Sequence, residues 1–198
     1  MKKWIPILVV LAIIAVAVMA LAGQYNKMVD LDEAVDSQWG NVENVYQRRA
    51  DLIPNLVETV KGYASHERET LEAVVKARAD ATRMQAQLTP ESLNDPEIMQ
   101  KFQAVQGELS TALGRLMVVI EKYPELKANE NFRDLQTQLE GTENRIAVER
   151  RRFNEQAQEF NTVIRRFPAN MVAGMFGFAK KGYFEAAEGT ETAPKVEF

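Results

Sequence analysis

The clearest structural signal in the sequence is an apolar repeat in residues 131–167. Residues 131–167 read NFRDLQTQLEGTENRIAVERRRFNEQAQEFNTVIRRF, and apolar side chains recur there at every seventh position: Phe132, Leu139, Ile146, Phe153, Phe160 and Phe167. A sustained seven-residue repeat predicts a long helix that packs against a partner helix with a left-handed supercoil. The companion positions of the repeat hold both apolar and polar residues: Leu135, Thr142, Val163, Glu149 and Gln156. This mixture predicts a broad interface between the two helices that water partly enters.

A second helix is expected upstream, from Pro96 to Tyr123. Its apolar residues are spaced by four and three positions, which places them on one stripe: Ile98, Phe102, Val105, Leu109, Ala112, Leu116, Val119 and Tyr123. Asp95 is a suitable N-cap, and Pro96 takes the first helical position, where a missing N–H costs little. Pro124 is expected to stop the helix.

The stretch from Tyr25 to about Leu88 also carries a helical stripe. One heptad register contains Tyr25, Trp39, Tyr46, Ile53, Val60 and Val74. The stripe continues through Pro54, which removes a helical N–H and frees an upstream carbonyl. Two interpretations follow: one long helix that kinks at Pro54, or two helices joined near Asp51, which would cap the second.

These segments predict an all-α fold. Turn-forming residues follow Leu88 and fill the connection from Pro124 to Glu130. Three or four helices joined by short turns favour an antiparallel, up-and-down bundle of long helices over residues 24–167.

The N-terminal segment, residues 1–23, is expected to be a single transmembrane helix. Trp4 to Ala22 contains no charged side chain. At about 1.5 Å per residue these 19 residues (22 − 4 + 1) cover roughly 28 Å, close to the hydrocarbon thickness of a bilayer. The lipid bilayer is therefore the first expected partner of the chain.

Two interpretations of this segment compete. Ala20-Leu21-Ala22 before Gly23 has the small-x-small form that a signal peptidase accepts, and cleavage would release a soluble periplasmic module. The apolar run is longer than a typical cleaved signal, which favours a retained signal anchor. Lys2 and Lys3 place the N-terminus in the cytoplasm and the bulk of the chain on the extracytoplasmic side of the bacterial inner membrane.

The composition changes after Phe167. Residues 168–184 are apolar and aromatic, and they are too short to span a bilayer. Such a segment either covers the open end of the bundle or lies on the membrane surface, and we expect capping because large exposed apolar patches are uncommon. Residues 185–198 are expected to form a flexible acidic tail.

Composition excludes several function classes. The chain has no Cys and one His, so it offers neither a thiolate nor a multi-histidine metal site, and we expect no cofactor or metal. A net charge of −4 argues against nucleic acid as a partner. No phosphate-binding loop, nucleophile elbow or zinc-helix motif occurs, so we expect no enzyme.

One group of polar residues near the apolar stripe is the candidate site. Our hypothesis is a buried or half-buried network in which Arg49 pairs with a carboxylate and fixes helix register. Asn55, just after Pro54, is expected to bond the freed backbone. The proposed members are Asp32, Arg49, Asp51, Asn55, His66 and Glu67. Neighbours on a helix point about 100° apart, so His66 and Glu67 make a poor catalytic pair. Glu143 and the arginines around Arg150 are expected on a solvated face.

Four stretches carry a resemblance to a known family. The segments 25–29 (YNKMV), 47–57 (QRRADLIPNLV) and 63–67 (YASHE), with the later block 135–167 that includes ERRRFN, resemble the LemA family of bacterial membrane proteins. The resemblance implies an N-terminal anchor and a long-helix bundle, and it implies no assigned activity. Relatives used in building intracellular membrane compartments suggest a membrane-organising role. The family's usual description places the small N-terminus outside the cell, opposite to what Lys2 and Lys3 indicate.

The sequence thus predicts a membrane-anchored interaction module that forms homo-oligomers or binds another envelope membrane protein. The expected contact residues lie on the Phe132–Phe167 helix and the segment after it: Phe132, Phe153, Phe160, Met171, Met175, Phe176, Phe178, Tyr183 and Phe184. Two rival functions are regulation of a membrane protease or envelope stress partner through His66 and Glu67, and membrane remodelling by the C-terminal amphipathic segment.

Overall fold

The computed structural model describes residues 4–185, and within them it contains helices and no strand. The helices are α1 (Ile5–Tyr63), α2 (Arg68–Gln85), the 3₁₀ helix η1 (Pro90–Asn94), α3 (Pro96–Ile120), α4 (Pro124–Ala128), α5 (Glu130–Val163) and α6 (Ala169–Phe176). The all-α prediction is confirmed. Lys2, Lys3 and the expected tail after Glu185 lie outside the described residues.

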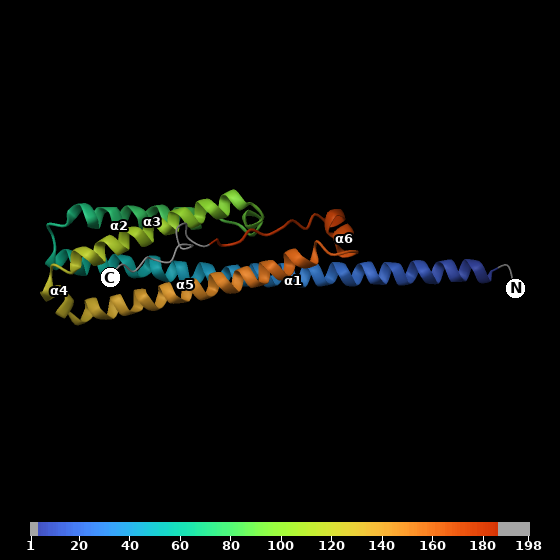
Figure 1. Ribbon diagram of the computed structural model, residues 1–198, viewed down its shortest axis with the longest axis horizontal. Helices are drawn as coiled ribbons and strands as arrows, with labels where there is room; N and C mark the ends of the chain where they lie inside the picture. The colour runs from blue at the N-terminus through green and yellow to red at the C-terminus, as the bar shows by residue number, and fades with distance from the viewer. Residues whose placement is uncertain (1–3, 186–198) are drawn as a thin grey trace, which may run out of the picture.

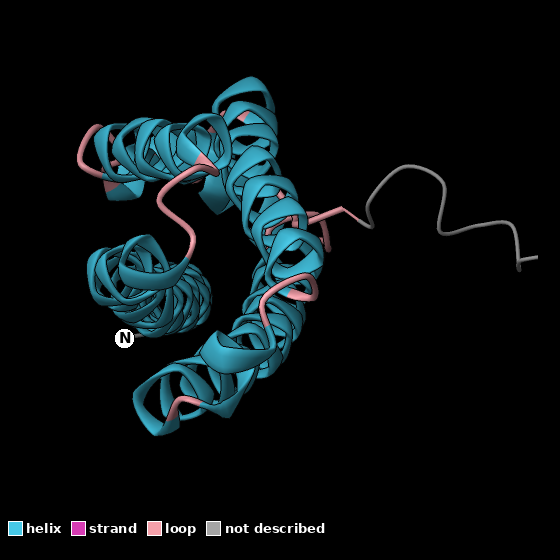
Figure 2. Cartoon of the chain, turned by 90° about the vertical axis from the view of Figure 1, so that its left-hand side faces the viewer, coloured by secondary structure: helices cyan, strands magenta, loops and turns pink. Residues whose placement is uncertain are grey.

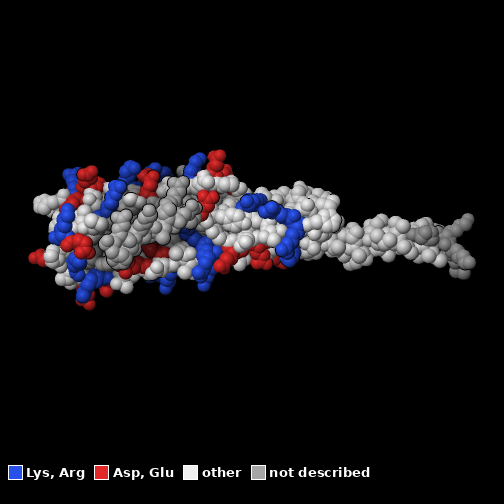
Figure 3. All heavy atoms as spheres, viewed as in Figure 1, with Lys and Arg blue, Asp and Glu red and all other residues white. Residues whose placement is uncertain are grey.

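Helix α1 runs without a break from the N-terminal apolar segment into the bundle (Figure 1). Its first part contains a window long and apolar enough to cross a membrane, and the protein buries none of that window. Charged side chains lie over the bundle and are absent from the projecting part of the helix (Figure 3). This part confirms the predicted transmembrane helix.

The long helices form the predicted up-and-down arrangement. Helix α2 returns antiparallel to the second half of α1, α3 runs back along α2, and α5 returns along α1 (Figure 1). The most extensive helix pairs are α1 with α5 and α2 with α3. Viewed along its long axis, the molecule consists of helices joined by short loops (Figure 2).

The core is divided into two apolar clusters by a polar layer. The membrane-proximal cluster includes Trp39, Phe102 and Phe153, and the distal cluster includes Ile53 and Leu116. At the level between them each of three helices contributes a buried polar side chain: Arg49 of α1, Gln106 of α3 and Thr142 of α5. A shifted helix would bring an apolar side chain against these polar groups, which is the arrangement that the register hypothesis for Arg49 requires.

Most of the heptad repeat of α5 is confirmed as a core seam. Its first five apolar members are at most 4% exposed: Phe132, Leu139, Ile146, Phe153 and Phe160. The sixth member, Phe167, is 80% exposed. The reason is that α5 ends at Val163, four residues earlier than the repeat suggests, so Phe167 lies beyond the helix.

The caps of α3 and α5 follow the sequence rules. Asp95 accepts hydrogen bonds from the N–H groups of Glu97 (2.8 Å) and Ile98 (3.4 Å), as predicted for an N-cap. Asn129 does the same for Phe132 at 3.0 Å. Helix α3 ends at Ile120, and the expected turn contains the short helix α4.

The first soluble stretch agrees with the first interpretation at Pro54, which lies inside a helix, but it differs in where that helix ends. Helix α1 continues through Pro54 to Tyr63, and the chain then turns at residues 64–67 before α2 begins. The stripe passes through this turn because α2 faces the same distal core as α1, so Val60 and Val74 are both fully buried. The two helices are therefore joined by a turn at residues 64–67, which begins ten residues after Pro54.

Helix α1 tolerates Pro54 because α2 supplies the missing donor. Pro54 lies on the exposed face and has no N–H for the carbonyl of Ala50, four residues earlier. The Nε of Arg78 in α2 donates to that carbonyl at 2.6 Å. Asn55 does not take this role, and its own carbonyl accepts from the Thr59 hydroxyl at 2.8 Å. The expectation for Asn55 was wrong because its side chain is exposed.

Candidate functional site

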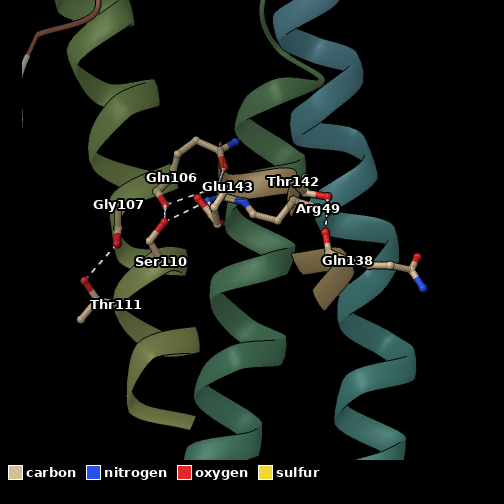
Figure 4. Close-up of polar contacts among 8 residues, drawn as sticks. All are labelled: Arg49, Gln106, Gly107, Ser110, Thr111, Gln138, Thr142 and Glu143. Carbon is tan, nitrogen blue, oxygen red and sulfur yellow. Dashed lines mark hydrogen bonds and ion pairs between the residues drawn. The ribbon is translucent and has the colours of Figure 1, made fainter. Parts of the chain in front are cut away.

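The polar layer of the core centres on the guanidinium of Arg49 (Figure 4). Arg49 is 1% exposed, and its Nη1 donates to Glu143 Oε1 at 2.8 Å and to Ser110 Oγ at 2.9 Å. Its Nη2 donates to the Gln106 side-chain oxygen, and the Gln106 carbonyl lies 3.4 Å from the same nitrogen. One arginine of α1 thereby joins α3 to α5.

The surroundings of Arg49 compensate a buried charge. Its guanidinium carbon lies 5.2 Å from the centre of the Tyr46 ring, within range of a cation–π contact. Burial raises the pKa of the Tyr46 phenol above its usual range, and the positive charges of Arg150 and Arg49 partly offset that rise. Glu143 keeps 42% of its side chain exposed, so water reaches one side of the ion pair.

A surface hollow of about 590 Å³ opens over this layer between α3 and α5. Ser110 stands in its wall, and the Ser110 hydroxyl lies 3.2 Å from the Gln106 carbonyl, to which it donates. The Nη1 of Arg49 donates to the Ser110 hydroxyl oxygen at 2.9 Å. The Ser110 hydroxyl thus lies between a guanidinium, from which it accepts, and a backbone carbonyl, to which it donates.

A second polar site holds the chain after α6. We call residues 178–185 the C-terminal strap. Asn161 of α5 accepts the Lys181 N–H and donates to the Lys181 carbonyl, both at 2.9 Å. Seven residues earlier, Asn154 makes the same pair of bonds to Phe184 at 2.7 and 2.8 Å. Two asparagines of α5 thus replace the neighbouring strand that an extended backbone would otherwise need.

Helix α3 and η1 complete the hold on the strap. Gln103 accepts from the Glu185 N–H at 2.9 Å, and the Gly182 N–H donates to the Leu93 carbonyl at 2.7 Å. A Cβ at Gly182 would lie 3.1 Å from Met99 Cγ and 3.4 Å from that carbonyl. The close approach therefore favours glycine at this position.

Two side chains of the strap enter the core. Lys181 is 4% exposed and pairs with Asp32 at 2.8 Å and Asp36 at 3.4 Å, both on α1. Phe184 is 5% exposed, and its ring lies 5.4 Å from that of Phe153 and 6.1 Å from that of Trp39. The strap is therefore part of the folded bundle.

The proposed polar-network residues lie in four different places. Only Arg49 lies in the polar layer; Asp32 pairs with Lys181 instead. Asp51 is exposed and accepts from Gln47 at 2.8 Å. His66 is exposed, and Asn55 has no contact with Arg49. They were grouped because they lie near one stripe, but Asp51 and Asn55 point away from the core and the chain turns at His66.

Glu67 and Tyr123 form a separate contact at the distal end of the bundle. The Tyr123 hydroxyl donates to Glu67 Oε1 at 3.0 Å, joining the start of α2 to the turn after α3. This hydrogen bond raises the pKa of the Tyr123 phenol. Within residues 4–185 no three His, Asp or Glu side chains gather as a metal-ligand set.

The expected contact residues divide into core and surface. Phe132, Phe153 and Phe160 are buried because the heptad seam faces α1, so they do not form a contact surface. Phe184 is buried with the strap, and Phe178 and Tyr183 are half-buried. The exposed members are all on α6: Met171 (59%), Met175 (79%) and Phe176 (60%).

Sequence reasoning missed most partners in these two sites. Glu143 was expected on a solvated face, and Gln106 and Ser110 carried no signal beyond their helical position. Asn154 and Asn161 do carry one: each follows a heptad phenylalanine, at a spacing of seven. That spacing places both amides on the same edge of the α5 seam.

A candidate membrane helix that continues into an antiparallel helical bundle defines a class: membrane-anchored helical-bundle proteins. The family model described as LemA family matches residues 38–198, and the chain belongs to that family. It is a single-pass membrane protein by its one N-terminal membrane helix and its relatives.

Curated relatives match the chain over most of its length. Magnetosome protein MamQ 1 of Paramagnetospirillum magneticum is 28% identical over 202 residues, which cover 95% of this chain and 73% of the relative. Magnetosome protein MamQ of Magnetospirillum gryphiswaldense is 26% identical, covering 94% and 75%. Protein LemA of Metamycoplasma hominis is 22% identical, covering 94% and 80%.

Proposed function

We propose that this protein is a non-enzymatic scaffold of the bacterial inner membrane, which binds further copies of itself or another envelope membrane protein. The observation that carries the proposal is the continuity of α1, a 59-residue helix that is both membrane anchor and bundle helix. A bundle fixed to its anchor in this way presents the same faces at the same height above the bilayer in every copy.

Membrane attachment favours weak contacts between such copies. Molecules confined to one membrane meet at a raised effective concentration, so a modest contact area suffices for assembly. Two relatives carry the name magnetosome protein, and a membrane-organising role for this chain agrees with that name. Within the described residues no feature indicates an enzyme.

The outer face of α5 is the surface proposed for self-association. It lies opposite the buried heptad seam and carries exposed residues along its length: Glu140, Ala147, Arg151 and Gln158. Opposite charges are interspersed on it, as in Arg151 and Glu155, whose charged atoms lie 3.8 Å apart. Such a face suits a reversible contact between copies.

Cysteine crosslinking in native membranes tests this function. The chain has no Cys, so single substitutions along α5, such as Ala147→Cys and Gln158→Cys, report only on themselves. Crosslinked dimers are expected at the outer face with a helical period of about 3.6 residues. Val118→Cys on α3, 69% exposed, controls for random collision. Dimers no more abundant than at Val118, together with a single mass in native mass spectrometry, would refute self-association.

Labelling of Asn44→Cys decides on which side the bundle lies. Asn44 is exposed on the bundle half of α1. The proposed orientation predicts that a membrane-impermeant maleimide labels it in spheroplasts whose inner membrane is intact. Labelling only after lysis would place the bundle in the cytoplasm.

A further inference from the structure

Helix α6 presents an apolar surface that the rest of the bundle leaves open. We define the α6 patch as Phe167 just before the helix and Met171, Met175 and Phe176 within it; these side chains are 80%, 59%, 79% and 60% exposed. The opposite side of α6 packs on the bundle through Ala169, Val172 and Ala173, which are at most 5% exposed. The helix is therefore apolar on both sides, with its small side chains against the bundle and its larger ones facing outward.

The position of α6 along α1 indicates what covers this patch. The Phe176 ring lies 4.7 Å from the ring of Tyr25, and the Phe178 ring lies 5.8 Å from it. Tyr25 is three residues beyond Ala22, a rise of about 4.5 Å along the helix. Figure 1 shows α6 beside α1 where the membrane segment leaves the bundle. With Trp4–Ala22 in the hydrocarbon layer, α6 lies at the level of the lipid headgroups.

The chain on both sides of α6 holds it at this level. Its N-terminal side follows directly from α5, whose Val163 and Ile164 are buried. Its C-terminal side is held by the strap, through the Asn161 bonds and the Lys181 ion pair with Asp32. Moving α6 away from the membrane would break these contacts.

Positive charges flank the patch. Lys27, Arg165, Arg166 and Lys180 are exposed, and within residues 4–185 none of them forms an ion pair. Figure 3 shows basic side chains at the end of the bundle nearest the membrane helix, beside an uncharged surface. An apolar face with a basic rim matches a membrane interface that contains anionic headgroups.

From this geometry we propose that the α6 patch inserts into the interfacial layer of the same bilayer that α1 crosses, with anionic lipid headgroups bound by the basic rim. The protein then has two contacts with one membrane, a spanning helix and a surface helix, and the bundle is fixed in tilt and rotation as well as in height. This inference requires the membrane anchor and is independent of self-association.

Depth measurements on the full-length protein test the proposal. A nitroxide on Met175→Cys is measured in lipid nanodiscs that each hold one copy, with Phe167→Cys as a second site. Collision rates with oxygen and with a water-soluble nickel complex report the surroundings: lipid gives high oxygen and low nickel exposure, and a protein interior gives low values of both. References are Ile13→Cys in the membrane segment and Val118→Cys on the distal bundle.

The proposal predicts nickel exposure at residue 175 several-fold below that at residue 118, with oxygen exposure approaching that at residue 13. Exposure equal to that of Val118→Cys at both α6 sites would overturn it. Protection that appears only in discs with two copies would also overturn it, since the occupant would then be a second chain. Because single-copy discs are used, failure of self-association leaves this result unaffected.

Lipid composition tests the basic rim. Nickel protection at residue 175 is expected to be stronger in phosphatidylglycerol than in phosphatidylcholine, and a triple variant, R165E/R166E/K180E, should lose the difference. Equal protection in the two lipids would contradict the role of anionic headgroups.

Discussion

The two halves of α1 have the same backbone and opposite surroundings. Before Gly23 the side chains are apolar on all sides, and large ones such as Val9 and Ile14 are more than half exposed. From Met28 onward the apolar residues keep to one stripe, and Met28, Val35 and Val42 are fully buried. Helix formation is common to both halves, so the distribution of apolar residues around the axis determines which solvent each half requires.

The largest effect is expected at Trp39 in the bundle part of α1, and Trp4, the residue just before α1, serves as its control. Trp39→Ala should destabilise the bundle by about 3–5 kcal/mol, because the ring contacts Phe102 and Phe153 at 5.5 and 5.6 Å and its removal leaves a cavity. Trp4→Ala, at 69% exposed, is the control and should change the unfolding free energy by less than about 0.5 kcal/mol. Urea unfolding in detergent measures both, and equal effects would contradict the division of α1.

A charged residue introduced into each part of α1 should impair membrane insertion in the first part and not in the bundle part. Ile13→Asp lies near the centre of the apolar run and should raise the cost of membrane insertion by about 2.5–3.5 kcal/mol. Asn44→Asp, on the exposed face of the bundle half, should leave membrane integration unchanged. Carbonate extraction of membranes compares the two: release of both variants would contradict the membrane role of this segment, and full retention of the Ile13 variant would contradict the predicted cost of the charge.

The third prediction concerns the stability of the bundle when Arg49 is removed from the polar layer. Arg49→Met should lower stability by about 2–3 kcal/mol, because Gln106 and Ser110 lose a buried donor. Arg48→Met, the exposed neighbour, is the matched control. Thermal unfolding followed by circular dichroism checks the pair, and an unchanged melting temperature for Arg49→Met would refute the register role of this arginine.

The contact that supports Pro54 can be isolated by a double-mutant cycle. Arg78→Met should cost about 1–2 kcal/mol, since the Ala50 carbonyl loses its donor. In a Pro54→Ala background the helix regains an N–H for that carbonyl, so the same change should cost less. Equal costs in both backgrounds would mean that Arg78 does not replace the missing donor.

The smallest effect concerns Glu43. Burial raises the pKa of the Glu43 carboxyl above its ordinary value, and a hydrogen bond with the Trp39 side chain partly offsets the rise. The folded state then binds the proton more tightly than the unfolded state, so this contribution to stability is present below about pH 4.5 and is lost as pH rises through the folded pKa. Glu43→Gln should therefore be more stable than the wild type at pH 7 by on the order of a few tenths of a kcal/mol, because water screens the half-exposed group. The difference should vanish near pH 4, and a Gln variant less stable at pH 7 would contradict the sign.

Local patterns in the sequence predicted much of the fold. The heptad positions of α5, the Asp95 cap and the membrane helix depend on neighbouring residues, and the structure confirms them. The hairpin between α1 and α2 was not predicted. Apolar residues keep the same spacing whether one helix continues or a second helix turns back and faces the same core. Val60 and Val74 keep one register through that turn.

The candidate sites were less predictable because their partners are distant in sequence. Arg49 stood out as a charge near an apolar stripe, but Glu143 lies 94 residues away on a helix with many similar carboxylates. Asn161 and Asn154 bind backbone groups of the strap, and a backbone group has no identity that a sequence pattern can reveal. Lys181 likewise pairs with Asp32, which lies far from it in sequence on α1.

Both of our proposals depend on the unbroken course of α1 from the bilayer into the bundle, beside which α6 packs. Gly23 stands at the junction, where a hinge would disconnect the two halves. The most direct test is the distance between spin labels on Ile14→Cys and Asn44→Cys in nanodiscs, which are 30 residues apart (44 − 14). A continuous helix predicts a narrow distribution centred at about 45 Å, at about 1.5 Å per residue. A broad distribution reaching well below that distance would show that α1 bends or breaks at the junction.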